Sequence, residues 1–191
     1  IALLMAVLLK LDLALARGRY GQWLGAVPPR LEAQADAPFQ ILELRHPLLV
    51  WQQRKEGGAP VVPVSVEVSE QLRVVAITGP NTGGKTVTLK SIGLAALMAR
   101  AGMWLPCNGS PSLPWCAQVL ADIGDEQSLQ QSLSTFSGHV KRIGSILQSI
   151  ASGPSPALVL LDEVGAGTDP SEGTALAIAL LRNLANCARL T

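Results

Sequence analysis

The sequence predicts an α/β domain whose sheet is mainly parallel and is flanked by helices. From about residue 41 onward, short apolar runs alternate with segments of helical periodicity, which is the order of elements in βαβ units. Two of these runs, 74–77 and 157–161, contain no polar residue, as expected for strands covered on both faces. Hydrophobic residues make up 48% of the 191 residues and charged residues 15%, so one sizeable core is possible.

Residues 1–9 are apolar, but Lys10, Asp12 and Arg17 follow well short of the roughly 20 apolar residues that span a bilayer. No basic segment precedes the run, as a secretory signal would require. We therefore expect a buried or packed helix over about residues 1–16 and no association with a membrane. The first residue is Ile1 rather than Met, from which we expect the chain to be a segment of a longer protein.

Glycines and prolines punctuate the next stretch, which has little periodicity and reads as a linker over residues 21–40. In 62–68, valines alternate with other residues, which predicts a half-buried strand, and Pro63 favours a sheet edge. The apolar run within 72–78 predicts a central strand. Residues 86–100 are apolar nearly all round, which predicts a largely buried helix ending near Gly102.

Apolar residues at helical spacing over 140–150 predict an amphipathic surface helix. The run 157–161 predicts a second fully covered strand. Asp169 followed by Pro170 has the form of a helix N-cap and first helical residue, and the helix should continue through Leu184.

The strongest motif matches GxxxxGK[ST] and lies between an apolar run and a predicted helix, the context that a phosphate-binding loop requires. Backbone N–H groups of such a loop and the positive end of the helix surround a phosphate. The lysine would reach the β- and γ-phosphates of ATP, and the last hydroxyl would ligate Mg²⁺. The motif consists of Gly79, Pro80, Asn81, Thr82, Gly83, Gly84, Lys85 and Thr86.

Two carboxylates end the apolar run 157–161 and have the form of a Walker B strand. Asp162 would hold Mg²⁺, commonly through water. Glu163 would orient or deprotonate the attacking water, because a carboxylate beyond the metal ligand suits general-base work. A third polar segment, which includes Ser134 and Thr135, precedes the amphipathic helix. Its hydroxyls suit either a γ-phosphate site or a simple helix cap.

The net charge and the cysteine content argue against several other kinds of protein. The formal net charge is +1, from 15 Lys+Arg and 14 Asp+Glu, which excludes a broad basic field that binds nucleic acid by charge alone. Cys107, Cys116 and Cys187 show no CxxC spacing, which argues against a disulfide framework or a zinc site and favours a reducing, cytoplasmic compartment.

Taken together, the motifs resemble the ATPase domain of the MutS family. Within that family, the motifs resemble most the bacterial and plastid branch that lacks the mismatch-recognition domain. It covers about residues 41–191, and the strings that carry it are RHPLL at 45–49, TGPNTGGKTVTLK at 78–90, DIGDEQS at 122–128, SLSTFSGH at 132–139 and LDEVGAGTDP at 161–170.

The resemblance implies an ABC-type P-loop NTPase fold over 41–191, incomplete at its C-terminal end, preceded in 1–20 by the end of a helical core or lever region. It implies a homodimer in which Ser134 and Thr135 contact the γ-phosphate of the partner's ATP and 165–169 faces the dimer. Lys85 and Glu163 would be the catalytic residues. The switch histidine of this class is expected beyond residue 191, and His46 and His139 are not at its position.

Family members use ATP to drive a clamp on branched DNA, which suppresses homologous recombination, or on stalled ribosomes, in the bacterial cytoplasm or the plastid stroma. These contacts, and an endonuclease domain, would lie in parts of the protein outside this chain. Two alternatives remain: a different P-loop phosphotransferase, and a nucleotide-binding fragment without turnover.

Overall fold

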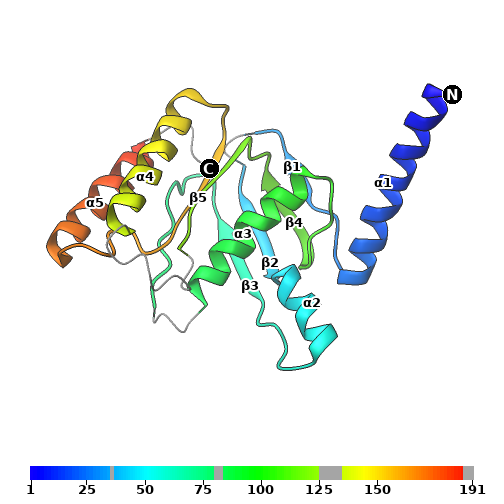
Figure 1. Cartoon of the computed structure of the whole chain (residues 1–191), viewed down its shortest axis with the longest axis horizontal. Helices are drawn as coiled ribbons and strands as arrows, with labels where there is room; N and C mark the ends of the chain where they lie inside the picture. The colour runs from blue at the N-terminus through cyan, green and yellow to red at the C-terminus, as the bar shows by residue number, and fades with distance from the viewer. Residues whose placement is uncertain (35–36, 80–83, 125–134, 187–191) are drawn as a thin grey trace.

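The computed structural model describes residues 1–34, 37–79, 84–124 and 135–186, and Figure 1 shows their arrangement. The helices are α1 (Ala2–Leu24), α2 (Pro47–Glu56), α3 (Lys85–Arg100), α4 (Thr135–Ser152) and α5 (Pro170–Asn186). The strands are β1 (Arg30–Glu32), β2 (Phe39–Leu44), β3 (Val64–Val68), β4 (Asn108–Pro114), β5 (Gln118–Asp122) and β6 (Ala157–Leu161).

The larger sheet has four strands in the order β1-β4-β2-β3. Strands β1 and β4 are parallel, whereas β2 runs antiparallel to both β4 and β3. Phe39, Ile41 and Leu44 of β2 are all buried, although Leu44 breaks the period of two. A register shift between Ile41 and Leu44 accounts for this, because a bulge turns the following side chain to the other face.

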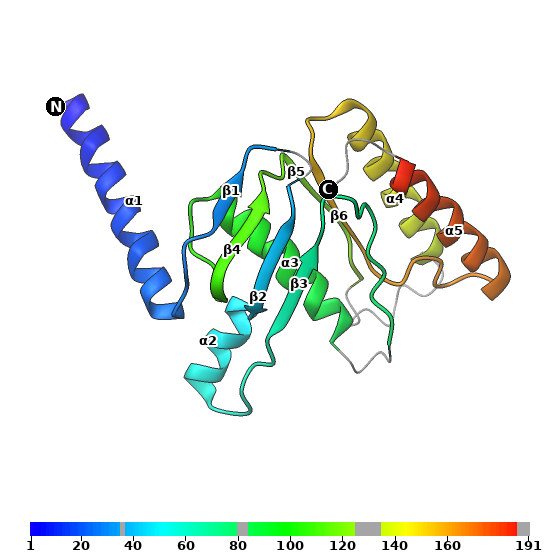
Figure 2. The same ribbon diagram turned by 180° about the vertical axis from the view of Figure 1, so that it is seen from behind.

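Helix α3 lies across one face of this sheet, as Figures 1 and 2 show from opposite sides. Its buried side chains join those of β2 and β4 in the first hydrophobic core, which includes Ile41, Ile92, Ala95, Met98 and Leu113. Helix α3 also contacts β6 closely: a Cβ built on Gly93 would lie 2.5 Å from Leu160 Cδ1. The glycine therefore lets the helix approach the strand that ends in the predicted metal ligand.

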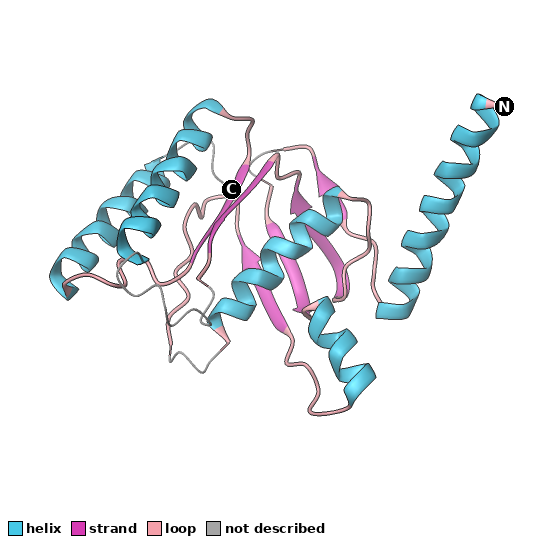
Figure 3. Ribbon diagram, in the orientation of Figure 1, coloured by secondary structure: helices cyan, strands magenta, loops and turns pink. Residues whose placement is uncertain are grey.

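The smaller sheet is the parallel pair β5 and β6, with Gln118–Asp122 in register with Ala157–Leu161. Leu158 and Leu160 belong to the first core, on the α3 side, whereas Ala157, Val159 and Leu161 pack in a second core with α4 and α5. Those two helices lie side by side on the outer face (Figure 3). The prediction of a strand at 157–161 covered on both faces is confirmed.

The expected mainly parallel sheet and ABC-type P-loop NTPase fold are wrong for this structure. A mixed sheet with two antiparallel pairs and a separate two-stranded parallel sheet stand in its place. Alternation of strands and helices does not fix strand direction. Here the chain leaves β2, forms α2 and returns as β3 antiparallel to β2, so that helix is not a crossover between parallel strands.

The predicted central strand at 72–78 is also wrong, because these residues form no ladder with any described strand. Val74 packs against the second core, but the side chains of Val75 and Ile77 are 54% and 41% exposed. An apolar run indicates a preference for burial on both faces. It does not supply the neighbouring strand edge that a ladder needs.

Helix α1 is longer than expected and reaches Leu24, where Gly25 ends it in the left-handed conformation with φ 65°. The expectation of a buried or packed helix over 1–16 is wrong, since these side chains are exposed and only the C-terminal end packs, through Gly21 and Leu24. Figure 1 shows the rest of the helix standing away from both sheets. Among the described residues, no helix combines the length and apolar character that crossing a bilayer requires.

The other predicted elements are confirmed with small shifts. Strand β3 is an edge strand that begins directly after Pro63. Helices α3 and α5 begin within one residue of their expected starts, and Asp169 Oδ1 accepts a hydrogen bond from the backbone N–H of Ser171 at 2.9 Å, as a cap does. Helix α4 is amphipathic as predicted, with Ile143, Ile146 and Ile150 on its buried face.

Candidate functional site

The candidate site lies where the N-terminus of α3 meets the C-terminal end of β6. Gly79 has a φ of 145° and Gly84, the N-cap of α3, has a φ of 78°. Both values fall where glycine is favoured. Lys85 and Thr86 are the first residues of α3. Pro80, Asn81, Thr82 and Gly83 lie outside the described residues.

The Lys85 ammonium lies close to the start of the loop, where Nζ donates to the Gly79 carbonyl oxygen at 2.5 Å. An ammonium carries three N–H donors, so this bond is compatible with a further contact to an anion. The backbone N–H groups of the first helical turn point the same way and add the positive end of the helix dipole. The described part of the loop therefore has the charge and donors that a phosphate requires.

Thr86 and Asp162 meet directly: the threonine Oγ1 donates to Asp162 Oδ2 at 2.6 Å. Asp162 directly follows β6, and its exposed fraction is only 9%. Hydroxyl and carboxylate oxygens are hard ligands, and Mg²⁺ is commonly held by one or two carboxylates with waters and substrate phosphates completing its shell. The described residues contain no group of three or more His, Cys, Asp or Glu side chains that could hold a metal. The donor pair thus fits a magnesium ion shared with a nucleotide.

Glu163 is exposed and has a φ of 49°, in the left-handed region. For a residue other than glycine this conformation costs roughly 1–3 kcal/mol. A turn holds the residue there, since the N–H of Ala166 donates to the Glu163 carbonyl oxygen at 3.0 Å. The exposed Glu163 side chain thus directly follows the buried Asp162 at the end of β6.

The loop after Glu163 packs against the start of α5 through two glycines. A Cβ built on Gly165 would lie 2.5 Å from the carbonyl oxygen of Gly173, and one built on Gly173 would lie 2.4 Å from that of Gly165. Gly165 also has a φ of 85°. This contact fixes the position of the loop relative to α5, and through the loop it limits where Glu163 can lie.

Replacing Gly165 with alanine is expected to lower the free energy of unfolding by about 2–4 kcal/mol, because left-handed strain adds to a backbone overlap that no rotamer can relieve. Gly144→Ala is the matched control. Gly144 lies inside α4 with no atom within 4 Å of a built Cβ, so alanine should raise stability by up to about 1 kcal/mol. Urea unfolding of both variants tests this, and equal stabilities would show that the glycine contact is not present.

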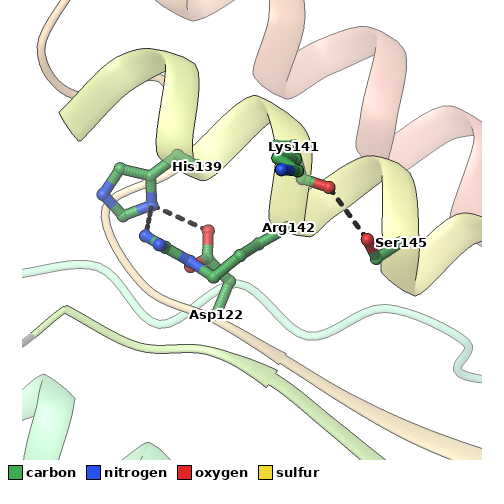
Figure 4. Close-up of polar contacts among 5 residues, drawn as sticks. All are labelled: Asp122, His139, Lys141, Arg142 and Ser145. Carbon is green, nitrogen blue, oxygen red and sulfur yellow. Dashed lines mark hydrogen bonds and ion pairs between the residues drawn. The ribbon is translucent and has the colours of Figure 1, made fainter. Parts of the chain in front are cut away.

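The residues that sequence reasoning missed lie at the end of the neighbouring strand. Asp122 ends β5, is 3% exposed, and accepts from two side chains of α4. His139 Nδ1 lies 2.7 Å from its Oδ2, and Arg142 Nε lies 2.5 Å from its Oδ1 (Figure 4). The run Val119–Leu120–Ala121 before Asp122 repeats the pattern of apolar strand followed by aspartate seen at 158–162, and this was the signal available in the sequence.

Ser134 lies outside the described residues, and Thr135 is the first residue of α4, with a side chain outside the described set. The structure therefore brings together Gly79, Gly84, Lys85, Thr86, Asp162 and Glu163, and places the backbone of Thr135 at the start of the helix that Asp122 holds.

His46 and the cysteines, which the sequence analysis also considered, lie away from the candidate site. His46 is the N-cap of α2, and its buried Nδ1 has no hydrogen-bond partner among the described residues. Burial lowers the pKa of His46, and the positive charge of Lys90 lowers it further, so the ring is neutral near pH 7. Burial raises the pKa of both Cys107 and Cys116 to about 11. Both thiols therefore stay protonated near pH 7.

Comparison with known proteins gives consistent matches. The family profile described as MutS domain V matches residues 75–191. A protein named endonuclease MutS2 from Synechocystis is 57% identical over 204 residues, which cover 98% of this chain and 25% of that relative. Proteins of the same name from Clostridium beijerinckii and Thermomicrobium roseum are 42% and 47% identical and are covered to 22% each. The chain thus spans about a quarter of the length of the curated relatives it matches.

Proposed function

Since this chain belongs to the MutS family, whose domain V profile matches residues 75–191, we propose that it binds Mg²⁺-ATP at the α3–β6 edge and hydrolyses it. The observation that carries the proposal is the 2.6 Å hydrogen bond between Thr86 Oγ1 and Asp162 Oδ2. These residues are 76 positions apart in the chain, and their contact joins the glycine-rich loop to the strand-end carboxylates. That pairing of elements is the one that phosphoryl transfer by P-loop proteins uses.

Each described residue has a distinct part in this proposal. Lys85 would contact the β- and γ-phosphates together with backbone N–H groups of the motif 79–84. Thr86 and Asp162 would hold Mg²⁺, directly or through water. The ion would supply positive charge that neutralises the phosphate oxygens.

Glu163 is the proposed general base. Its carboxylate accepts a proton from a water molecule, whose oxygen bonds to the γ-phosphorus while the bond from that phosphorus to the β,γ-bridging oxygen breaks. The products are ADP and inorganic phosphate. The support for this role is positional, because Glu163 directly follows the buried Asp162 yet is itself exposed and held in a left-handed conformation.

We further propose that the protein works as a homodimer and that Ser134 and Thr135 of one copy contact the γ-phosphate bound by the other. In the natural protein, ATP turnover would drive a clamp on branched DNA or on stalled ribosomes. The word endonuclease in the names of the relatives supports DNA over the ribosome as the target of the whole protein. Residues outside this chain would make that contact.

A mixing experiment tests the ATPase and the homodimer together, in the natural protein that carries this sequence. A variant changed to alanine at Ser134 and Thr135 keeps its own loop and Asp162, so it should bind ATP. Mixed with Lys85→Ala protein, its intact loop faces the unchanged Ser134 and Thr135 of the partner, so the heterodimer regains one complete site, and hydrolysis should rise above that of either variant alone. Mixed with unchanged protein, it retains one complete site, and hydrolysis should persist.

Two results would overturn these assignments. Hydrolysis in the first mixture that stays as low as in either variant alone would show that the two defects do not complement each other, which contradicts the assignment of Ser134 and Thr135 to the partner's nucleotide. Full hydrolysis by the Ser134 and Thr135 variant alone, at a concentration where it is monomeric, would contradict the shared site itself.

A further inference from the structure

Hydrogen bonds through two aspartates connect Thr86, at the start of α3, with the first turns of α4. Thr86 Oγ1 donates to the Asp162 carboxylate at 2.6 Å, and the backbone N–H of Asp162 donates to the carbonyl oxygen of Asp122 at 2.9 Å. The Asp122 carboxylate then accepts from His139 and Arg142 of α4. Four elements, α3, β6, β5 and α4, are thereby joined through two aspartates at the same sheet edge.

Asp122 is the junction of this path. Its side chain is 3% exposed, whereas those of His139 and Arg142 are 18% and 53% exposed. A carboxylate this buried must have its charge and its acceptor sites satisfied, and the two α4 donors do this with one bond to each oxygen. Figure 4 shows both side chains reaching down from the helix to the strand end.

The geometry also assigns a proton on His139. At 2.7 Å from a carboxylate oxygen, Nδ1 must carry a hydrogen and donate, because two acceptors would repel. Arg142 Nη2 lies 3.3 Å from the same Nδ1, and a guanidinium nitrogen cannot donate to an atom that is itself donating. The Arg142 contact is therefore packing, and both α4 residues act as donors to the aspartate. His139 and Arg142 are therefore both held by Asp122 and not by a hydrogen bond to each other.

We propose that Asp122 is a positioning residue that sets the place of α4, and with it the start of that helix at Thr135, relative to the C-terminal end of β6. This inference rests on the proposed function for its effect on catalysis, but the positioning itself is a statement about α4. Asp122 does not touch the nucleotide or the metal. It sets where α4 begins, and under the proposed function this helix start belongs to the part of the chain that contacts the partner's nucleotide.

The test uses the natural protein with four single substitutions. Asp122→Asn keeps the size but replaces one acceptor oxygen with an NH₂ group that faces a donor. His139→Leu removes the donor, whereas His139→Asn places an amide N–H near the position of Nδ1 and should restore the bond. Glu67→Gln is the control, because Glu67 is an exposed carboxylate on β3 away from this path.

For catalysis, Asp122→Asn and His139→Leu should each lower kcat for ATP hydrolysis about tenfold or more, as expected when a reacting group is misplaced by about an ångström. The KM for ATP should change less than twofold, because the loop, Thr86 and Asp162 are intact. His139→Asn should recover kcat to within threefold of the unchanged protein. The Asp122→Asn, His139→Leu double variant should be no slower than the slower single variant, since both changes break one interaction.

A second readout follows α4 directly. Amide hydrogen exchange over 137–143 should accelerate about tenfold or more in Asp122→Asn, while exchange over α5 stays unchanged. Unchanged exchange over 137–143 overturns the inference, and so does a kcat loss that His139→Asn fails to recover. If the unchanged protein hydrolyses no ATP, the proposed function fails, and the exchange measurement alone then decides the role of Asp122.

Discussion

Replacing Lys85 with alanine is expected to weaken Mg²⁺-ATP binding by about 100-fold or more. The Lys85 ammonium lies next to the loop, with its Nζ 2.5 Å from the Gly79 carbonyl oxygen. Charge-assisted hydrogen bonds to phosphate oxygens contribute roughly 1.5–3 kcal/mol each, and a tenfold change in affinity corresponds to about 1.4 kcal/mol. Two such bonds therefore account for the expected loss.

Lys90→Ala is the matched control for this change. It removes the same charge from the same helix, but Lys90 is exposed and lies more than one helical turn beyond the loop. Equilibrium titration with Mg²⁺-ATP should give an affinity within about threefold of the unchanged protein for this variant. Tight binding by Lys85→Ala, equal to that of the control, would remove the assignment of residues 79–86 as the phosphate site.

Replacing Glu163 with glutamine should stop hydrolysis while binding persists. The amide keeps the size of the side chain, and Asp162 and Thr86 keep the metal ligands, but the attacking water loses its base. General-base catalysis contributes typically 10²- to 10⁴-fold, so phosphate release should fall by about that factor. The dissociation constant for Mg²⁺-ATP should stay within about threefold, because no atom that contacts the phosphates has changed.

Glu56→Gln serves as the control for Glu163, because Glu56 is an exposed carboxylate at the end of α2. Its rate of phosphate release should equal that of the unchanged protein. An undiminished rate in Glu163→Gln would show that another group activates the water, and the exposed, left-handed residue after Asp162 would then need a structural explanation.

Helices α4 and α5 were predictable because their signals are local. The period of apolar residues in 140–150 and the cap at Asp169 act within a few residues, and the structure has α4 and α5 at these places. Strand β4 was not predictable, since its sequence NGSPSLP is typical of a turn. It nevertheless lies inside the larger sheet between β1 and β2, with Pro111 and Pro114 fully buried. Neighbouring strands, not its own propensity, decide its structure.

The same distinction applies to the candidate site. The meeting of Thr86 with Asp162 was predictable, because a glycine-rich motif before a helix and carboxylates after an apolar strand form a recognisable pair of sequence signals. Asp122 was not singled out, because a single aspartate after a short apolar run is a weaker signal than the pair of carboxylates at 162–163. Only the fold shows that β5 ends beside β6 and that two donors of α4 reach its carboxylate.

Calorimetric titration of the natural protein with ATP, with Mg²⁺ present and then with the metal chelated, measures whether ATP binding depends on the metal. Because Thr86 and Asp162 would share the metal with the nucleotide, we expect a single saturable site per chain whose affinity falls by about tenfold or more without Mg²⁺. Circular dichroism of the same sample establishes that the protein is folded. A folded protein that binds no ATP, or binds it equally well with and without Mg²⁺, would contradict the account.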